Sequence, residues 1–109
     1  MLGKFEIMKA KNNEFYFNLK ASNSQVILTG QMYSSKDSAK SGIESVKKSA
    51  SADAQYERKT SPAGHSFVLK AANGEVIGRS EVYSTTGARD SGIESVKTNG
   101  HGADIEDLS

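Results

Sequence analysis

A set of four polar residues occurs twice in the chain with the same internal spacing. The set consists of Ser41, Glu44, Ser45 and Lys47 in the first copy and of Ser91, Glu94, Ser95 and Lys97 in the second. Hydroxyl and charged side chains on a helix face can bind a ligand, bond to a neighbouring strand, or form ion pairs along the helix. A recent duplication would also make the two sets match. We therefore favour structural support or ancestry as the reason for the match, with a two-fold-related binding surface as the alternative interpretation.

No residue pattern in the chain indicates catalysis. Nucleophilic catalysis needs a Ser, Thr or Lys beside a base, and the sequence has neither a GxSxG motif nor an SxxK set with its partner motifs. Motifs that bind phosphate or zinc, such as GxGxxG, GxxxxGK and HExxH, are also absent. The two histidines, His65 and His101, fall in expected loops and have no counterpart in the other copy. We predict a protein that is not an enzyme, with no catalytic residue and no cofactor.

One short segment does contain residue types that bind metals. His101 is followed by Asp104, Glu106 and Asp107, and imidazole and carboxylate groups are ligands of divalent metals. A polar segment of this kind is more typical of a solvated chain end. We expect no metal site.

The composition narrows the class of protein. Fourteen Lys and Arg against thirteen Asp and Glu give a net charge of +1, whereas proteins that bind nucleic acid mainly through phosphates normally have a clear basic excess. The absence of cysteine excludes disulfides and thiolate metal sites. The first residues lack the apolar segment of a signal peptide, and no stretch is apolar over the length of a membrane span. We expect a cytoplasmic protein with no membrane partner.

The two polar sets belong to a longer internal repeat. Residues 17–47 align without a gap with residues 67–97, and 16 of these 31 positions are identical. A unit of about fifty residues is marginally stable alone, so the two copies are expected to share one core. We predict a single domain, residues 1–109, made of repeat one (1–54) and repeat two (55–109). We expect a monomer, with dimerisation through an unpaired outer strand as the alternative.

Each repeat is predicted to contain three antiparallel strands followed by a helix. Residues 15–21 alternate between apolar and polar side chains, and the alternation resumes at residue 26 after a turn. Ala39, Ile43 and Val46 recur at the spacing of one helix face, and Gly42 beside them indicates close approach of the sheet or of the sister helix. The predicted core consists of Phe15, Phe17, Leu19, Val26, Leu28, Met32, Ile43, Val46, Phe67, Leu69, Val76, Val82, Ile93 and Val96.

The residues LKAxN, VI, YS and SGIESVK occur in this order in both copies. They resemble the YegP-like family, small and mostly bacterial proteins that are described as a domain of unknown function. The resemblance covers essentially the whole chain and implies an α+β fold of two β-β-β-α-β units. The units would form one antiparallel sheet with both helices on one face, in a pseudo-two-fold arrangement. On this reading they exchange their closing strands, around residues 54–60 and 103–107. The resemblance implies no activity, substrate or catalytic residue.

A shared sheet with helices on one side would leave its other face open. Five repeated or basic residues are predicted on that face: Lys20, Tyr33, Lys70, Arg79 and Tyr83. Aromatic side chains among basic ones can bind single-stranded nucleic acid, because bases stack while cations follow the phosphates. The net charge of the chain, only +1, argues against nucleic-acid binding on this face. We favour a binding module for an unknown protein or small ligand, with weak nucleic-acid binding on the sheet as the alternative.

Overall fold

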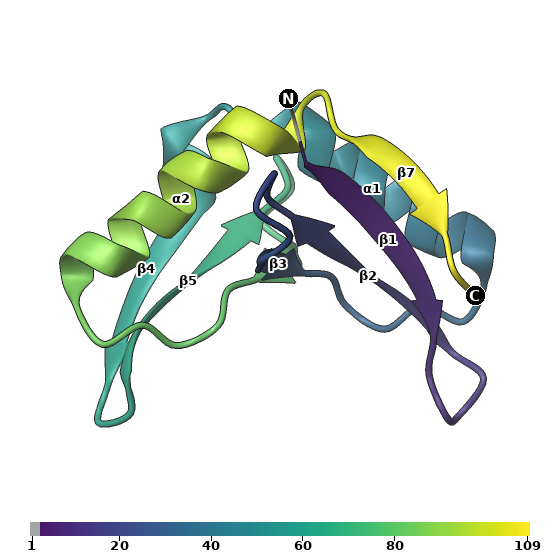
Figure 1. Cartoon of the computed structure of the whole chain (residues 1–109), viewed down its shortest axis with the longest axis horizontal. Coiled ribbons are helices and arrows are strands. Elements are labelled where there is room, and N and C mark those ends of the chain that lie inside the picture. The colour runs from purple at the N-terminus through teal and green to yellow at the C-terminus, as the bar shows by residue number, and fades with distance from the viewer. Residues whose placement is uncertain (1–2) are drawn as a thin grey trace.

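Within residues 3–109, which the computed structural model describes, the chain folds into seven β-strands and two α-helices (Figure 1). The strands are β1 (Lys4–Lys9), β2 (Phe15–Lys20), β3 (Val26–Thr29), β4 (Tyr56–Ser61), β5 (Gly64–Lys70), β6 (Val76–Arg79) and β7 (Asp104–Asp107). The helices are α1 (Lys36–Ser49) and α2 (Thr86–Gly100). The predicted order of three strands and a helix is therefore present in both halves.

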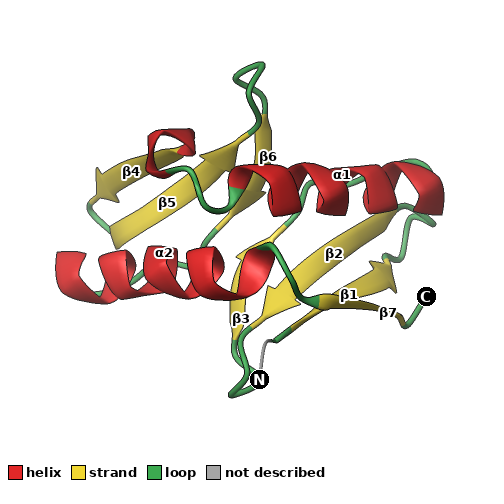
Figure 2. Cartoon of the chain, turned by 90° about the horizontal axis from the view of Figure 1, so that it is seen from above, coloured by secondary structure: helices red, strands yellow, loops and turns green. Residues whose placement is uncertain are grey.

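The strands of the described chain form one sheet, in the order β4-β5-β6-β3-β2-β1-β7. Neighbouring strands run antiparallel, except that β7 is parallel to β1. The equivalent strands β3 and β6 meet at the centre, where Thr29 lies opposite Arg79. Seen from above, both helices lie in front of the sheet (Figure 2), and in Figure 1 the sheet arches beneath them. The predicted α+β architecture is confirmed, and the face opposite the helices is open.

The closing strand changes repeats at one edge of the sheet only. β7 follows α2 of the second repeat and pairs with β1 of the first, with Lys4 opposite Asp104 and Ile7 opposite Asp107. After α1 the chain makes a short 3-10 turn at Asp53–Gln55 and enters β4, which pairs with β5. The outer side of β4 has no strand beside it in residues 3–109. The two repeats therefore differ at their edges.

Each helix begins at a hydroxyl cap. The Ser35 hydroxyl oxygen accepts a hydrogen bond from the Ser38 N–H at 3.1 Å, and the Thr85 hydroxyl accepts one from the Ala88 N–H at 3.0 Å. Such a bond satisfies a backbone N–H that has no partner inside the helix. In the described part of the chain, neither helix is long and apolar enough to cross a membrane. Their buried faces pack on the sheet instead.

Most of the predicted core is buried between the helices and the sheet. The fully buried members are Phe17, Leu19, Leu28, Ile43, Val46, Phe67, Leu69, Ile93 and Val96. Two further residues from β1, Phe5 and Ile7, are also fully buried. Because α1 contacts both β2 and β6, and α2 contacts both β5 and β3, the repeats share this core.

The predicted alternation in β3 and β6 is partly wrong. Exposed fractions are 36% for Val26, 47% for Met32, 55% for Val82, and only 7% for Ile27 and Ile77. The register between β2 and β3 shifts after Leu19, so that Ile27 lies opposite no residue, and β5 and β6 show the same shift. A bulge of this kind inserts one residue into a strand and changes which side chains face the core.

Tyr33 and Tyr83, which were predicted on the open face, are partly buried and pack against the core beneath the helices. The Tyr33 ring stacks on Phe17 with centroids 6.2 Å apart, and its hydroxyl lies against Gly42 of α1. Tyr83 meets Gly92 in the same way, because a Cβ at Gly92 would lie 2.6 Å from the Tyr83 hydroxyl oxygen. The helix glycines thus make room for tyrosine rings, not for a neighbouring backbone. Burial raises the pKa of both phenols.

The inward direction of the tyrosines has a backbone cause. The Gly30 N–H donates to the Phe17 carbonyl oxygen, and the Tyr33 N–H donates to the Phe15 carbonyl oxygen. The segment advances by three residues, from Gly30 to Tyr33, while its partner β2 advances by only two, from Phe17 to Phe15. The extra residue reverses the side-chain alternation, so that Tyr33 faces the helices. The second repeat has the equivalent bond from Tyr83 to the start of β5.

At the junction of the repeats, a larger residue of repeat one faces a glycine of repeat two. Leu28 of β3 lies over the equivalent Gly78 of β6, where an added Cβ would be 2.7 Å from the leucine side chain. Ala50 and Gly100 at the helix ends form a similar pair, with an added Cβ 2.8 Å from Ala50. Two leucines could not occupy the first space together. The junction is therefore built for two different repeats.

We expect the Gly92→Ala substitution to destabilise the protein by about 1–3 kcal/mol, because the new methyl group would overlap the Tyr83 hydroxyl. This loss would occur although alanine has the higher helix propensity. The free energy of unfolding from urea titration measures the effect. The Tyr83→Phe substitution in the same chain should recover part of the loss. Gly87→Ala, where an added Cβ meets only an atom 4.0 Å away, is the matched control and should not destabilise.

We expect acid to weaken the attachment of β7. Lys36 Nζ lies 2.8 Å from Asp107 Oδ2, and this lysine, with Ser109, lowers the pKa of Asp107 below its ordinary value of 3.8. A carboxyl with a lowered folded-state pKa stabilises the fold above its unfolded pKa, and this contribution is lost as the pH falls towards the folded value. The urea midpoint of Asp107→Asn should be below wild type at pH 6. The difference should narrow below about pH 4; a constant difference would show that the pair does not contribute.

Candidate binding surface

The repeated helix residues differ in how accessible they are. Ser41, Glu44, Ser91 and Glu94 are exposed, whereas Ser45, Lys47, Ser95 and Lys97 are half-buried. The half-buried members contact the rest of the protein. These contacts show whether packing could be the reason that the two repeats carry the same polar residues.

The two lysines of the sets cover aromatic rings of the sheet. Lys47 Nζ lies 6.0 Å from the centroid of Phe5 in β1, and Lys97 Nζ lies 5.9 Å from that of Tyr56 in β4. A lysine can bury its aliphatic stem on such a ring while its ammonium stays in water. Lys97 also lies 2.9 Å from Asp53 Oδ1, which raises the pKa of this lysine. Both lysines therefore hold a helix to the sheet.

Ser95 takes part in a contact that fixes the start of β1. The Asn99 side-chain amide donates to the Ser95 carbonyl oxygen at 2.8 Å and lies 3.3 Å from its hydroxyl. The Asn99 side-chain oxygen accepts from the Gly3 N–H at 2.7 Å. Asn99 is 6% exposed. These contacts give Ser95 a structural role.

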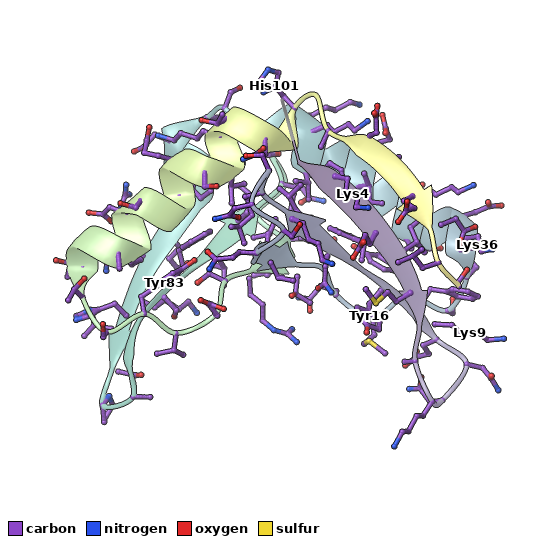
Figure 3. The ribbon with its side chains drawn as sticks, viewed as in Figure 1. Lys4, Lys9, Tyr16, Lys36, Tyr83 and His101 are labelled. Carbon is purple, nitrogen blue, oxygen red and sulfur yellow. The ribbon has the colours of Figure 1, made fainter. Side chains whose placement is uncertain are left out.

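The open face of the sheet carries one row of side chains that crosses the strands from β4 to β7. Strand register places the members of this row opposite one another: Glu57, Val68, Arg79, Thr29, Asn18, Glu6 and Glu106. The neighbouring positions Phe17 and Leu19 face the helices. Because side chains alternate along a strand, the row faces away from the core. Figure 3 shows Tyr16, which shares this face, on the underside of the sheet.

Lys20 and Lys70 lie on the open face as predicted, but each has a carboxylate partner. Lys20 Nζ lies 2.9 Å from Oε1 of Glu6, and Lys70 Nζ pairs with Glu57. The Glu6 carboxylate is nearly enclosed, because its side chain is 5% exposed, whereas the Lys20 side chain is 26% exposed. Lys70 lowers the pKa of Glu57. These pairs reduce the positive charge that the face offers to a phosphate backbone.

Arg79 is the predicted open-face cation that has no carboxylate partner in residues 3–109. Its guanidinium lies 3.5 Å from the Gln31 side-chain oxygen. Register places Val68 beside it and puts Val26 and Val76 opposite Lys20 and Lys70 on the same face. We call Val26, Val68, Val76 and Arg79 the valine–arginine patch. A cavity of about 260 Å³ lies against Val26 and Arg79, and Glu81 also lines it.

The residues considered for a metal site do not lie together, because those in β7 point to opposite faces of the sheet. Asp104 and Glu106 lie on the open face, whereas Asp107 faces α1 and pairs with Lys36. His101 caps the end of α2, where its Nδ1 lies 3.3 Å from a backbone carbonyl oxygen. Residues 3–109 contain no group of three or more His, Asp and Glu that could hold a metal ion.

Two buried charged residues were not singled out from the sequence. Glu6 is 4% exposed on the open face, and Arg89 is 9% exposed in the first turns of α2. Arg89 Nε lies 3.1 Å from Asp90 Oδ1, and Arg89 lowers the pKa of that carboxyl. Glu6 occupies a polar position in an alternating strand, where a charged side chain is ordinarily exposed. Arg89 occupies the position of Ala39 in the first repeat. The difference between the repeats could have drawn attention to Arg89 from the sequence. The local sequence pattern does not predict that Glu6 is buried.

Known proteins resemble this chain in both sequence and structure. UPF0339 protein YegP of Yersinia pestis is 53% identical over 58 residues, which cover 53% of this chain and 52% of that protein. UPF0339 protein YegP of Escherichia coli is 45% identical over 64 residues, 59% of this chain and 58% of that protein. The chain matches little more than half the length of these curated relatives.

The structural similarity extends further along the chain. The solution structures of a UPF0339 protein of Shewanella oneidensis and of YegP of Escherichia coli, described as a protein of unknown function, each have a TM-score of 0.93 and 45% identity. Each comparison covers 99% of this chain, with 92% and 94% of the respective structures. A family described as "Domain of unknown function (DUF1508)" matches residues 10–57 and again residues 63–107. This chain therefore belongs to the DUF1508 family, whose function is unknown.

Proposed function

We propose that this chain is a cytoplasmic, non-enzymatic interaction module that binds a protein partner on the valine–arginine patch. The observation that carries the proposal is the unpaired Arg79 among three valines on a sheet face that no helix covers. Arginine contributes strongly to protein interfaces, because its guanidinium can bind a carboxylate while its stem packs on apolar groups. The partner would supply an acidic side chain and apolar contacts.

The patch suits this role better than the helix-borne polar sets do. Lys47, Lys97 and Ser95 are engaged in packing and hydrogen bonding within the fold. Packing therefore explains part of the match between the two repeats. Val26 is 36% exposed, and neither packing nor capping accounts for an exposed valine beside an unpaired arginine.

The patch also suits a protein better than it suits nucleic acid. Tyr33 and Tyr83, the predicted stacking residues, are packed beneath the helices. Lys20 and Lys70 are paired with carboxylates. Single-strand binding depends on stacking platforms and on cations that are free to follow phosphates. We therefore propose a protein partner, and the test below includes a nuclease treatment that would detect nucleic-acid binding.

The test compares variants in a pull-down from bacterial lysate, with and without nuclease, at low and high salt. Arg79→Glu should reduce recovery of a discrete protein partner about tenfold or more, because a carboxylate now faces the acidic group of the partner. The control is Glu44→Gln with Glu94→Gln, which changes the exposed helix carboxylates and should leave recovery unchanged. Urea titration of each variant shows that the fold is intact.

Three results would contradict the proposal. Loss of the partner in the helix variant with retention in Arg79→Glu would move the binding surface to the helices. Recovery of nucleic acid that disappears at high salt would favour the alternative function. Equal recovery by wild type and Arg79→Glu would remove the patch as the interface.

A further inference from the structure

A second surface of this protein has the geometry of a small-molecule site. A cavity of about 430 Å³ opens where β7 and β1 meet the turn between β2 and β3. This volume is within the range of small-ligand pockets in proteins. The lining residues are Gly3, Lys4, Lys20, Ala21, Ser22, Ser24, Asp104, Ile105 and Glu106.

Three charged residues of the cavity stand in one row across three strands. Asp104 of β7 lies opposite Lys4 of β1, which lies opposite Lys20 of β2. Adjacent strands are about 4.8 Å apart, so the backbone of Asp104 is about 10 Å from that of Lys20. All three belong to the open face, and Figure 3 shows Lys4 next to β1 and β7. The row therefore places the Asp104 carboxylate and the Lys20 ammonium on either side of Lys4, on the same face of the sheet.

The middle lysine of the row is already engaged. Lys4 Nζ lies 3.2 Å from Glu106 Oε1 and 3.7 Å from Glu6 Oε2, and the hydrogen bond to Glu106 raises the pKa of this lysine. Glu6, buried beneath the row, thus holds Lys4 in place together with Lys20.

The two outer members of the row retain capacity to bind. Lys20 has three N–H donors and one carboxylate neighbour, Glu6, in the described chain, and its side chain is 26% exposed. Asp104 has no side-chain hydrogen bond or ion pair within residues 3–109. The hydroxyls of Ser22 and Ser24 also line the cavity. One carboxylate is thus available for an ammonium group, and one lysine with two serines for a carboxylate.

We propose that this cavity binds a small zwitterion of the α-amino-acid class. The ligand ammonium binds Asp104, and its carboxylate binds Lys20 and the serine hydroxyls. A ligand with only one of the two charges would leave one side of the cavity without a partner, and unpaired polar groups weaken binding. The site adjoins the valine–arginine patch, because Lys20 lies opposite Val26, but it shares no residue with the patch and does not depend on the proposed function.

The second repeat supplies an internal control. Lys70 pairs with Glu57 much as Lys20 pairs with Glu6, but no strand equivalent to β7 lies beside β4 in the described residues. The second repeat therefore has no counterpart of Asp104. The proposal predicts one site per chain, at the β7 edge.

The test is a ¹H–¹⁵N NMR titration of the full chain with glycine, serine, leucine and glutamate, each up to about 10 mM. At least one amino acid should shift the amide signals of Lys20 to Ser24 and Asp104 to Glu106, and leave those of Lys70 to Gly74 unmoved. Acetate and methylammonium, which carry one charge each, should bind about tenfold more weakly or not at all.

The variant that tests the site is Asp104→Asn, an exposed change that removes the ammonium partner. It should weaken the amino acid about tenfold or more without changing the spectrum elsewhere. Glu75→Gln, an exposed carboxylate in the corresponding turn of repeat two, is the matched control and should bind like wild type. Absence of shifts with every amino acid would overturn the proposal. So would equal shifts with acetate, or equal affinity of wild type and Asp104→Asn.

Discussion

The structure depends on the contact between the two repeats at the centre of the sheet. In the described chain, β3 and β6 are joined by one pair, Thr29 opposite Arg79, and β7 adds a second backbone connection between the repeats where it pairs with β1. Side-chain packing completes the junction: Leu28 fills the space over Gly78, and Ala50 lies against Gly100. Each helix also contacts strands of the other repeat. The core is thus continuous, and neither half could bury its apolar face alone.

The same packing decides which surfaces remain for binding. The helices bury their apolar residues against one face of the sheet. Tyr33 and Tyr83 pack against Gly42 and Gly92 on this side, so their rings are not available on the open face. What is left outside is a polar face with paired lysines, an unpaired Arg79 and exposed valines. The repeated lysines of the helices cover Phe5 and Tyr56. Matching polar residues in a duplicated chain can therefore have a packing cause.

The edges of the sheet show where the duplication is not symmetric. The chain continues from α1 directly into β4, whereas the chain after α2 is free to lie beside β1. All four residues of β7 are exposed, and ion pairs to Lys4 and Lys36 help to hold it. The charged cavity at this edge exists because β7 brings Asp104 and Glu106 next to residues of the first repeat.

The strands and helices of this protein could be predicted from the sequence, because they depend on local periodicity. The duplication, the hairpins, the helix faces and the buried Phe17 and Phe67 follow from the spacing of apolar residues. The inward turn of Tyr33 and the burial of Ile27 could not be predicted in this way, since bulges interrupt the alternation on which the prediction relied. The burial of Glu6 could not be predicted either, since it needs Lys20 from another strand. Such contacts join residues far apart in the chain, and no local pattern records which strands will become neighbours.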